Sequence, residues 1–129
     1  MSKLISNKKL PRCGEIWLVK FEKLKESRKP CRPCLIISND EQNAFDEWVV
    51  GAPLTTDYLE NIRLTEVFIE STPETGLDEP SKIQLNYPFT ADKKLRLVER
   101  LGKIDEETMS KVKKAWKNCL WLKLNEATQ

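Results

Sequence analysis

The residue with the clearest capacity for chemistry is Arg32, which stands at the head of an apolar run that continues to Ile37. The run predicts a short buried strand, and Asn39-Asp40 predict the turn that ends it. Because proline cannot donate to a sheet ladder, we expect the strand to begin at or just after Pro33, with Arg32 at its rim. A guanidinium there can donate two parallel hydrogen bonds to a phosphate. The alternative is a solvated arginine without a role.

The sequence contains four cysteines and no histidine. The lack of histidine removes the commonest general acid or base and the commonest metal ligand, so catalysis would depend on Arg, Lys, Thr, Ser, Tyr and carboxylates. Cys31 and Cys34 have zinc or redox spacing, and Cys13 and Cys119 would complete a tetrathiolate site. Since the second pair is split along the chain, we expect no metal there, and without a secretory signal we expect reduced thiols.

Composition predicts one ordinary globular domain, with 33% charged and 40% hydrophobic residues in a chain of 129. No apolar stretch is long enough to span a bilayer and no signal peptide is visible, so we expect no membrane contact and a cytoplasmic location. The net charge of +2 does not by itself indicate a nucleic-acid binder. The basic N-terminal residues predict either a solvated tail or a segment that contacts a polyanion.

Hydrophobic patterns predict short strands and one long helix. The strands are expected over residues 14–21, 35–37, 48–56, 63–70 and 82–86. Asp92 could cap a short helix, or 98–102 could return as a last strand. A C-terminal helix should begin after Asp105 and bury Met109, Val112, Trp116 and Leu120. This order of elements favours a strongly bent sheet or partly open barrel capped by a helix.

Two strand patterns place polar residues at an edge or on an open face. Gly51 and Pro53 predict a bend near the exit of the third strand, which sets Thr55 at an edge. The alternation over 82–86 points Ile83 and Leu85 to the core and leaves Lys82, Gln84 and Asn86 on one open face. The charged loop over 22–31 is either functional or a solvated hairpin connection.

Four segments together resemble one known family. These are Gly14-Glu15-Ile16-Trp17-Leu18-Val19, Arg32-Pro33-Cys34-Leu35-Ile36-Ile37-Ser38-Asn39-Asp40, Ala52-Pro53-Leu54-Thr55 and Arg100-Leu101-Gly102-Lys103-Ile104-Asp105-Glu106-Glu107-Thr108-Met109. In this order they resemble the MazF/PemK family of toxin-antitoxin modules. The resemblance implies a mainly β (α+β) fold, an SH3-like small barrel of about five to seven strands with a C-terminal amphipathic helix. It divides the chain into a basic arm (1–12), the toxin domain (13–122) and a tail (123–129).

The resemblance also implies an activity. Members are toxins of type II systems that cleave single-stranded RNA, including mRNA, sequence-specifically and without a metal or other cofactor. They are usually homodimers and are neutralised by a cognate antitoxin protein. The family's catalytic arginine and threonine correspond to Arg32 and Thr55. Arg32 would hold the charge that builds on the phosphate oxygens, and Thr55 would donate a second hydrogen bond.

The chain departs from the family at several positions. The segment that supplies a carboxylate or imidazole in relatives is Lys25-Glu26-Ser27-Arg28 here, so Glu26 is the nearest candidate for the base. Gln84 and Asn86 stand where the PemK-like branch has an arginine and an aspartate. They can bind RNA but cannot transfer protons, which predicts weak activity or an unusual target sequence. Ser38, Thr56 and Lys29 complete the expected RNA-binding set.

Two alternatives stay open. A CcdB-like gyrase poison shares this fold, and Trp121 is a faint match to the terminal tryptophan of that group. The substituted site could instead leave an RNA- or antitoxin-binding module with attenuated catalysis.

Overall fold

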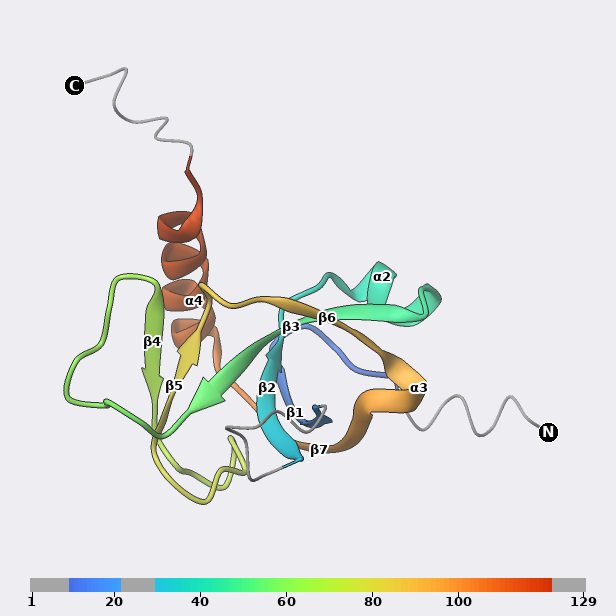
Figure 1. Cartoon of the computed structure of the whole chain (residues 1–129), viewed down its shortest axis with the longest axis horizontal. Coiled ribbons are helices and arrows are strands. Elements are labelled where there is room, and N and C mark those ends of the chain that lie inside the picture. The colour runs from blue at the N-terminus through green and yellow to red at the C-terminus, as the bar shows by residue number, and fades with distance from the viewer. Residues whose placement is uncertain (1–9, 22–29, 122–129) are drawn as a thin grey trace.

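The computed structural model describes residues 10–21 and 30–121, and within them the chain is a strongly bent antiparallel sheet with three helices (Figure 1). The elements are β1 (Glu15–Lys20), β2 (Cys31–Ile36), α2 (Asp40–Phe45), β3 (Trp48–Thr55), β4 (Glu66–Ile69), β5 (Ser81–Gln84), β6 (Phe89–Asp92), α3 (Lys93–Arg96), β7 (Leu97–Lys103) and α4 (Glu106–Cys119). None of the helices in this described part is both long and apolar enough to cross a lipid bilayer.

Strand β3 is shared among three ladders. The sheet order is β4-β5-β3-β2-β1-β7, and β6 also pairs with β3. Trp48 to Gly51 pair with β6, Gly51 to Pro53 with β2, and Leu54 and Thr55 with β5. The sheet bends as β3 changes partners, and among the described strands it does not close. The predicted mainly β fold, a small barrel with a C-terminal helix, is confirmed in this partly open form.

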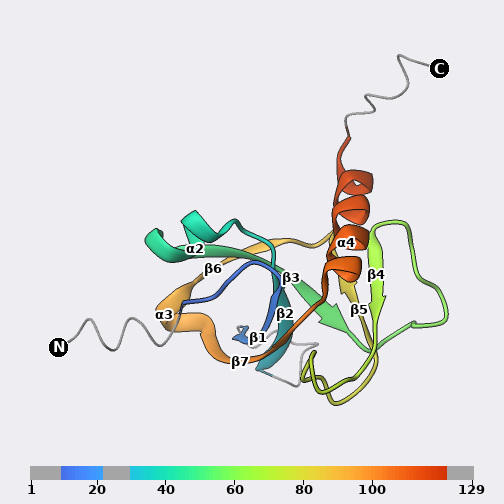
Figure 2. The same cartoon turned by 180° about the vertical axis from the view of Figure 1, so that it is seen from behind.

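The core consists of two apolar clusters, one on each face of the sheet. Along β2, Leu35 belongs to the cluster beneath α4, whereas Cys34 and Ile36 belong to the cluster that includes Ala91 and Leu97. Successive strand residues point to opposite faces, so one apolar run serves both clusters. Helix α4 stands beside β4 and β5 when the molecule is seen from either side (Figure 2).

Strand β2 begins at Cys31, earlier than predicted. Pro33 lies inside the strand, opposite Leu18 of β1. The prediction is wrong here because the ladder between β2 and β3 starts only at Cys34. At Pro33 the strand is therefore an edge on its β3 side, where a missing N–H is tolerated.

The segment after Asp92 was predicted to form either a short helix or a last strand, and it forms both in turn. The Asp92 carboxylate accepts hydrogen bonds from the N–H groups of Lys94 (2.8 Å) and Leu95 (3.0 Å) and so caps α3. The chain then returns as β7. Strand β6, which pairs with β3, was not predicted as a separate strand.

Helix α4 begins as predicted, and its buried face departs from the prediction only toward its C-terminal end. The Asp105 carboxylate accepts a hydrogen bond from the Thr108 N–H at 2.8 Å, as an N-cap does. Val112 is buried as predicted, and so is Ala115, whereas Trp116 and Leu120 are exposed, contrary to the prediction. Met109 and Cys119 pack at the margin of the same cluster. Trp116 is 37% exposed and lines a pocket together with Leu85, Met109 and Val112.

Two glycines mark a crossing of backbones. A Cβ atom on Gly76, which has a φ of +70°, would overlap the backbone of Leu101 in β7. A Cβ atom on Gly102 would overlap the backbone of Glu74 and Thr75. The Lys103 N–H donates to the Glu74 carbonyl at 2.9 Å. The 72–76 turn thus lies directly against β7, and only glycine leaves room there.

Candidate functional site

Arg32 and Thr55 lie at neighbouring strand ends. Arg32 is near the start of β2 and Thr55 is the last residue of β3, and the two strands run antiparallel with Cys34 opposite Pro53. Each residue lies two positions beyond that pair, toward the same end of the sheet. Because side chains alternate between faces with a period of two, both belong to the face of Cys34 and Pro53.

The Arg32 guanidinium is exposed and available to an anion. Its central carbon lies 5.7 Å from the centroid of the Phe21 ring, within range of a cation–π contact. Among the described residues it makes no hydrogen bond or ion pair. The neighbouring Arg96 is different, since it donates to the Lys20 carbonyl at 2.9 Å and to the Thr90 carbonyl at 3.2 Å. Arg32 therefore keeps its donors free while an aromatic ring orients it.

The Thr55 hydroxyl retains a donor. Its Oγ1 accepts a hydrogen bond from the Asp57 N–H at 3.1 Å. A hydroxyl has two lone pairs and one proton, so this bond fixes the oxygen and leaves the O–H to donate elsewhere. Thr55 is opposite Lys82 of β5, which brings a second element to the same strand end.

The polar face of β5 is not open at Lys82, contrary to the prediction. Ile83 and Leu85 do face the core, but Lys82 is only 4% exposed. Its ammonium pairs with Glu66 at 3.0 Å and donates to the carbonyls of Tyr58 (3.0 Å) and Asn61 (3.1 Å). All three N–H donors are thereby used. The alternation in the sequence carries no sign of this pair, because Glu66 comes from another strand.

Glu66 is the charged partner in this buried pair. Burial acts to raise the pKa of Glu66, but hydrogen bonds from the Arg63 N–H and from Lys82 outweigh it, so the pKa lies below its usual value. The Arg63 bond measures 2.9 Å. Glu66 is thus a carboxylate at neutral pH, and its pairing with Lys82 ties the loop between β3 and β4 to β5.

The other predicted RNA-binding residues fall in different surroundings. Gln84 ends β5 on the face of Lys82 and is partly buried. Asn86 follows in a turn, and its Oδ1 is buried without a hydrogen-bond partner among the described residues. Thr56 is exposed directly after β3. Glu26 and Lys29 lie outside the described residues.

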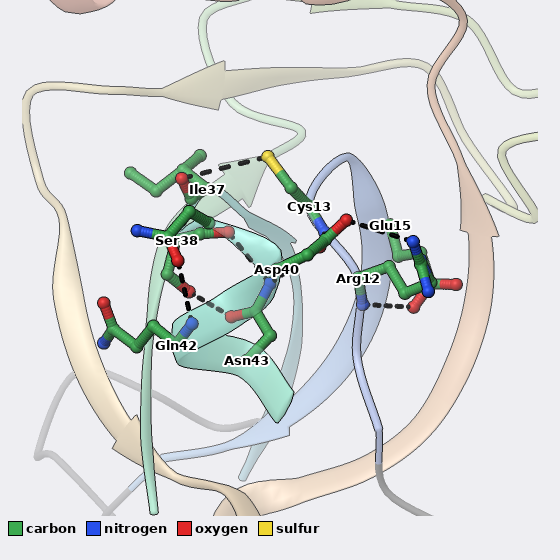
Figure 3. Close-up of polar contacts among 9 residues, drawn as sticks. Arg12, Cys13, Glu15, Ile37, Ser38, Asp40, Gln42 and Asn43 are labelled. Carbon is green, nitrogen blue, oxygen red and sulfur yellow. Dashed lines mark hydrogen bonds and ion pairs between the residues drawn. The ribbon is translucent and has the colours of Figure 1, made fainter. Parts of the chain in front are cut away.

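Ser38 lies in a buried polar network and not on the surface where an RNA contact was predicted (Figure 3). It is 7% exposed. Its hydroxyl donates to Asn43 Oδ1 at 2.5 Å and accepts from the Val50 N–H at 3.0 Å. The hydroxyl holds α2 against β3, so it has no free group for a ligand.

Asp40 joins the start of β1 to the end of β2. Its carboxylate accepts from the Cys13 N–H at 2.7 Å and from Arg12 Nη2 at 3.3 Å, and Asn43 Nδ2 lies 3.3 Å away (Figure 3). The hydrogen bond from Cys13 lowers the pKa of Asp40 below its usual value. This clamp fixes the β2 register that carries Arg32 at the other end of the strand.

Glu15 joins the first and the last of the four segments that carry the family resemblance. Its carboxylate accepts from the Arg12 N–H and the Trp17 indole N–H, both at 2.9 Å. It also pairs with Arg100 of β7 at 2.8 Å. These residues hold the sheet together, so their role in the pattern is structural.

The cysteines do not form the tetrathiolate arrangement considered from the sequence. Cys34 is buried and donates weakly to the Arg32 carbonyl, and burial raises the pKa of its thiol. Cys119 is on α4 and Cys13 is in the turn before β1. Within residues 10–21 and 30–121 no group of three or more Cys, Asp or Glu side chains is arranged to hold a metal ion.

Comparison with protein families decides among the readings. A family model for the PemK-like, MazF-like toxin of type II toxin-antitoxin systems matches residues 12–120. The chain belongs to this family. This PemK-like, MazF-like toxin has no significant match among curated proteins. The family assignment favours a toxin-antitoxin toxin over the CcdB-like gyrase poison considered from Trp121, whose side chain is exposed beyond the end of α4.

Solved structures of similar proteins agree with this assignment. An endoribonuclease from a mycobacterial species is 25% identical, with a TM-score of 0.68 over 88% of this chain and 93% of that chain. A mycobacterial endoribonuclease in complex with its cognate antitoxin is 26% identical, with a TM-score of 0.70 over 88% and 97%. The toxin MazF-mt6 of Mycobacterium tuberculosis shares the fold, with 22% identity and a TM-score of 0.70 over 84% and 98%.

Proposed function

We propose that this toxin is an endoribonuclease that cleaves single-stranded RNA, including mRNA, at specific sequences. The family assignment and the similarity to mycobacterial endoribonucleases support this activity. The observation that carries the site assignment is the β2–β3 register, which sets Arg32 and Thr55 at neighbouring strand ends on one face.

The proposed reaction is an internal phosphoryl transfer. The ribose 2′-oxygen forms a bond to the adjacent phosphorus, and the bond from phosphorus to the 5′-oxygen breaks. The 2′-hydroxyl loses a proton as it attacks, and the 5′-oxygen gains a proton as it leaves. The products are a cyclic phosphate and a 5′-hydroxyl. Arg32 holds the non-bridging oxygens as their charge grows, an effect typically worth about 3 kcal/mol. Thr55 donates a second hydrogen bond that keeps the phosphate in line.

The proposed reaction also needs a general base and residues that bind the RNA. Glu26 is the candidate base, and Gln84, Asn86, Thr56 and Lys29 are the candidate RNA contacts. Amide side chains at 84 and 86 can pair with base edges but cannot transfer protons. We therefore expect a rate below that of an enzyme with an acid or base at these positions.

The proposed protein partners are a cognate antitoxin and a second copy of the toxin. A similar mycobacterial endoribonuclease forms a complex with its cognate antitoxin, which supports the first. The family resemblance supports the homodimer.

The test is cleavage of a long RNA by the purified protein, with the new 5′ ends mapped. Wild-type protein should cut at a recurring sequence, and Arg32→Ala should lower the rate about a hundredfold or more. Lys111→Ala is the matched control, because Lys111 is an exposed cation on α4, which packs on the opposite face of the sheet from Arg32. Full activity of Arg32→Ala would overturn the site assignment.

RNA binding without cleavage would point to a different function. The amides at Gln84 and Asn86 favour, as the runner-up, a module that binds RNA or antitoxin with attenuated catalysis. RNA retained on a filter but left intact by wild-type protein would support that reading.

A further inference from the structure

The loop between β3 and β4 holds one residue in an unusual conformation. Tyr58 has a φ of +54°, the only positive φ at a non-glycine position among the described residues. A left-handed backbone is unfavourable at a bulky residue and persists only when its surroundings enforce it. The Tyr58 side chain is 74% exposed, so the ring does not supply that enforcement.

Buried charges hold the loop by its backbone. The Lys82 ammonium donates to the Tyr58 and Asn61 carbonyls, at 3.0 Å and 3.1 Å, and pairs with Glu66 at 3.0 Å. The Asn61 N–H also donates to the Tyr58 carbonyl at 3.2 Å. Glu66 accepts from the Arg63 N–H, which anchors the far end of the loop.

This arrangement is a costly way to stabilise a fold. Two charges with side chains 5% and 3% exposed have lost most of their hydration, and well-packed apolar residues in such a place are often equally or more stabilising. What the pair provides here is one defined path for the loop. The result is a strained backbone that presents an aromatic ring to solvent.

The loop that carries Tyr58 begins at the candidate site. Tyr58 follows Thr55 by three positions, and Thr55 is opposite Lys82 in the β3–β5 ladder. In Figure 1 the segment leaving β3 runs outside β4 before it turns back into that strand. The same lysine therefore borders the proposed catalytic hydroxyl and fixes the loop that carries the ring.

We propose that Tyr58 stacks on an RNA base beside the scissile phosphate and that Lys82 is its positioning residue. This inference depends on the proposed function, because the ligand is the single-stranded RNA. Unpaired bases stack readily on exposed aromatic rings. A net charge of +2 gives little general attraction to RNA, so a stacking contact would supply a large share of binding.

The first test replaces the ring and keeps the loop. Tyr58→Asn suits it because asparagine tolerates a positive φ. We expect KM for an RNA containing the mapped site to rise between about fivefold and a hundredfold, with a much smaller change in kcat. Tyr58→Phe should restore KM. Phe45→Asn is the matched control, because Phe45 is 87% exposed and precedes the other end of β3.

The second test addresses Lys82 without leaving a buried charge unpaired. Lys82→Met with Glu66→Leu removes both charges, and we expect it to fold, with KM raised as in Tyr58→Asn. A purely structural pair would change the melting temperature and leave KM alone. Circular dichroism and melting curves of each variant accompany the kinetics.

The outcomes separate this inference from the proposed function. If wild-type protein cleaves RNA and Tyr58→Asn has an unchanged KM, the stacking role is wrong and the nuclease assignment stands. If wild-type protein does not cleave, anisotropy of a labelled single-stranded RNA replaces KM as the measure of binding. Weaker binding by Tyr58→Asn would then support the inference, and equal binding or none by wild type would overturn it.

Discussion

At the scale of single residues, the site depends on which donors are already occupied. Arg32 and Thr55 each keep a donor free, whereas Lys82, Arg96 and Ser38 have committed theirs to other protein groups. Residue type and position made Arg32 a candidate, and the family resemblance added Thr55. They could not identify which neighbouring polar groups are occupied, because the partners come from distant parts of the chain.

Thr55 gives a test of that distinction. Thr55→Val keeps the shape and removes the hydroxyl, and we expect cleavage to slow about tenfold to a hundredfold because a hydrogen bond to a charged phosphate is lost. Thr55→Ser keeps the hydroxyl and should stay within about threefold of wild type. Single-turnover cleavage of one mapped RNA measures both. Equal rates for the valine and serine variants would remove Thr55 from the chemistry.

At the scale of elements, the strands were easier to predict than their partners. The apolar runs located β1, β2 and β3, and Asp92 and Asp105 located the starts of α3 and α4. The early start of β2 at Cys31 was missed because it depends on where the ladder with β3 begins. In α4 the prediction was correct at Val112 and wrong at Trp116 and Leu120, because contact with the sheet buries Ala115 in their place.

The clamp at Asp40 predicts how stability depends on pH. The folded pKa of Asp40 is lowered, so this carboxylate adds stability above its unfolded pKa and loses it as pH falls through the lower folded value. We expect the melting temperature to fall on acidification from about pH 4 downward, near the pKa of a free aspartate. Asp40→Asn should be less stable at pH 7 and lose less on acidification.

The control for this titration is Asp78→Asn, since Asp78 is an exposed carboxylate in the 70–80 loop. Melting curves from pH 7 to pH 3 for the three proteins give the comparison. Parallel curves for wild type and Asp40→Asn would contradict the proposed clamp.

At the scale of the whole molecule, the fold was predictable but the sharing of β3 was not. The family resemblance carried by four segments implied a small barrel, and the partly open sheet agrees with it. That β3 pairs with β6, β2 and β5 in turn depends on contacts between distant segments, which no local pattern encodes.

The low net charge predicts a shallow salt dependence of RNA binding. If Arg32 and Lys29 are the main phosphate contacts, the slope of log K against log salt should be about −1.4, from a factor of about 0.7 per neutralised phosphate. Arg32→Ala should reduce the slope by about 0.7, and Tyr58→Asn should leave it unchanged because stacking releases no counterions. Filter binding at several salt concentrations measures these slopes. A much steeper slope would indicate a broader basic surface than the one proposed.

Gly76 lies against the backbone of β7, and Gly102 lies against the backbone of the 72–76 turn. Neither glycine can therefore be replaced by a larger residue while the other segment keeps its path. In evolutionary terms the two glycines form a linked pair. A homologue with a side chain at one of them must have rebuilt the 72–76 turn, and such sequences should differ in the length of that turn. Aligned relatives should therefore show the glycines retained together or lost together.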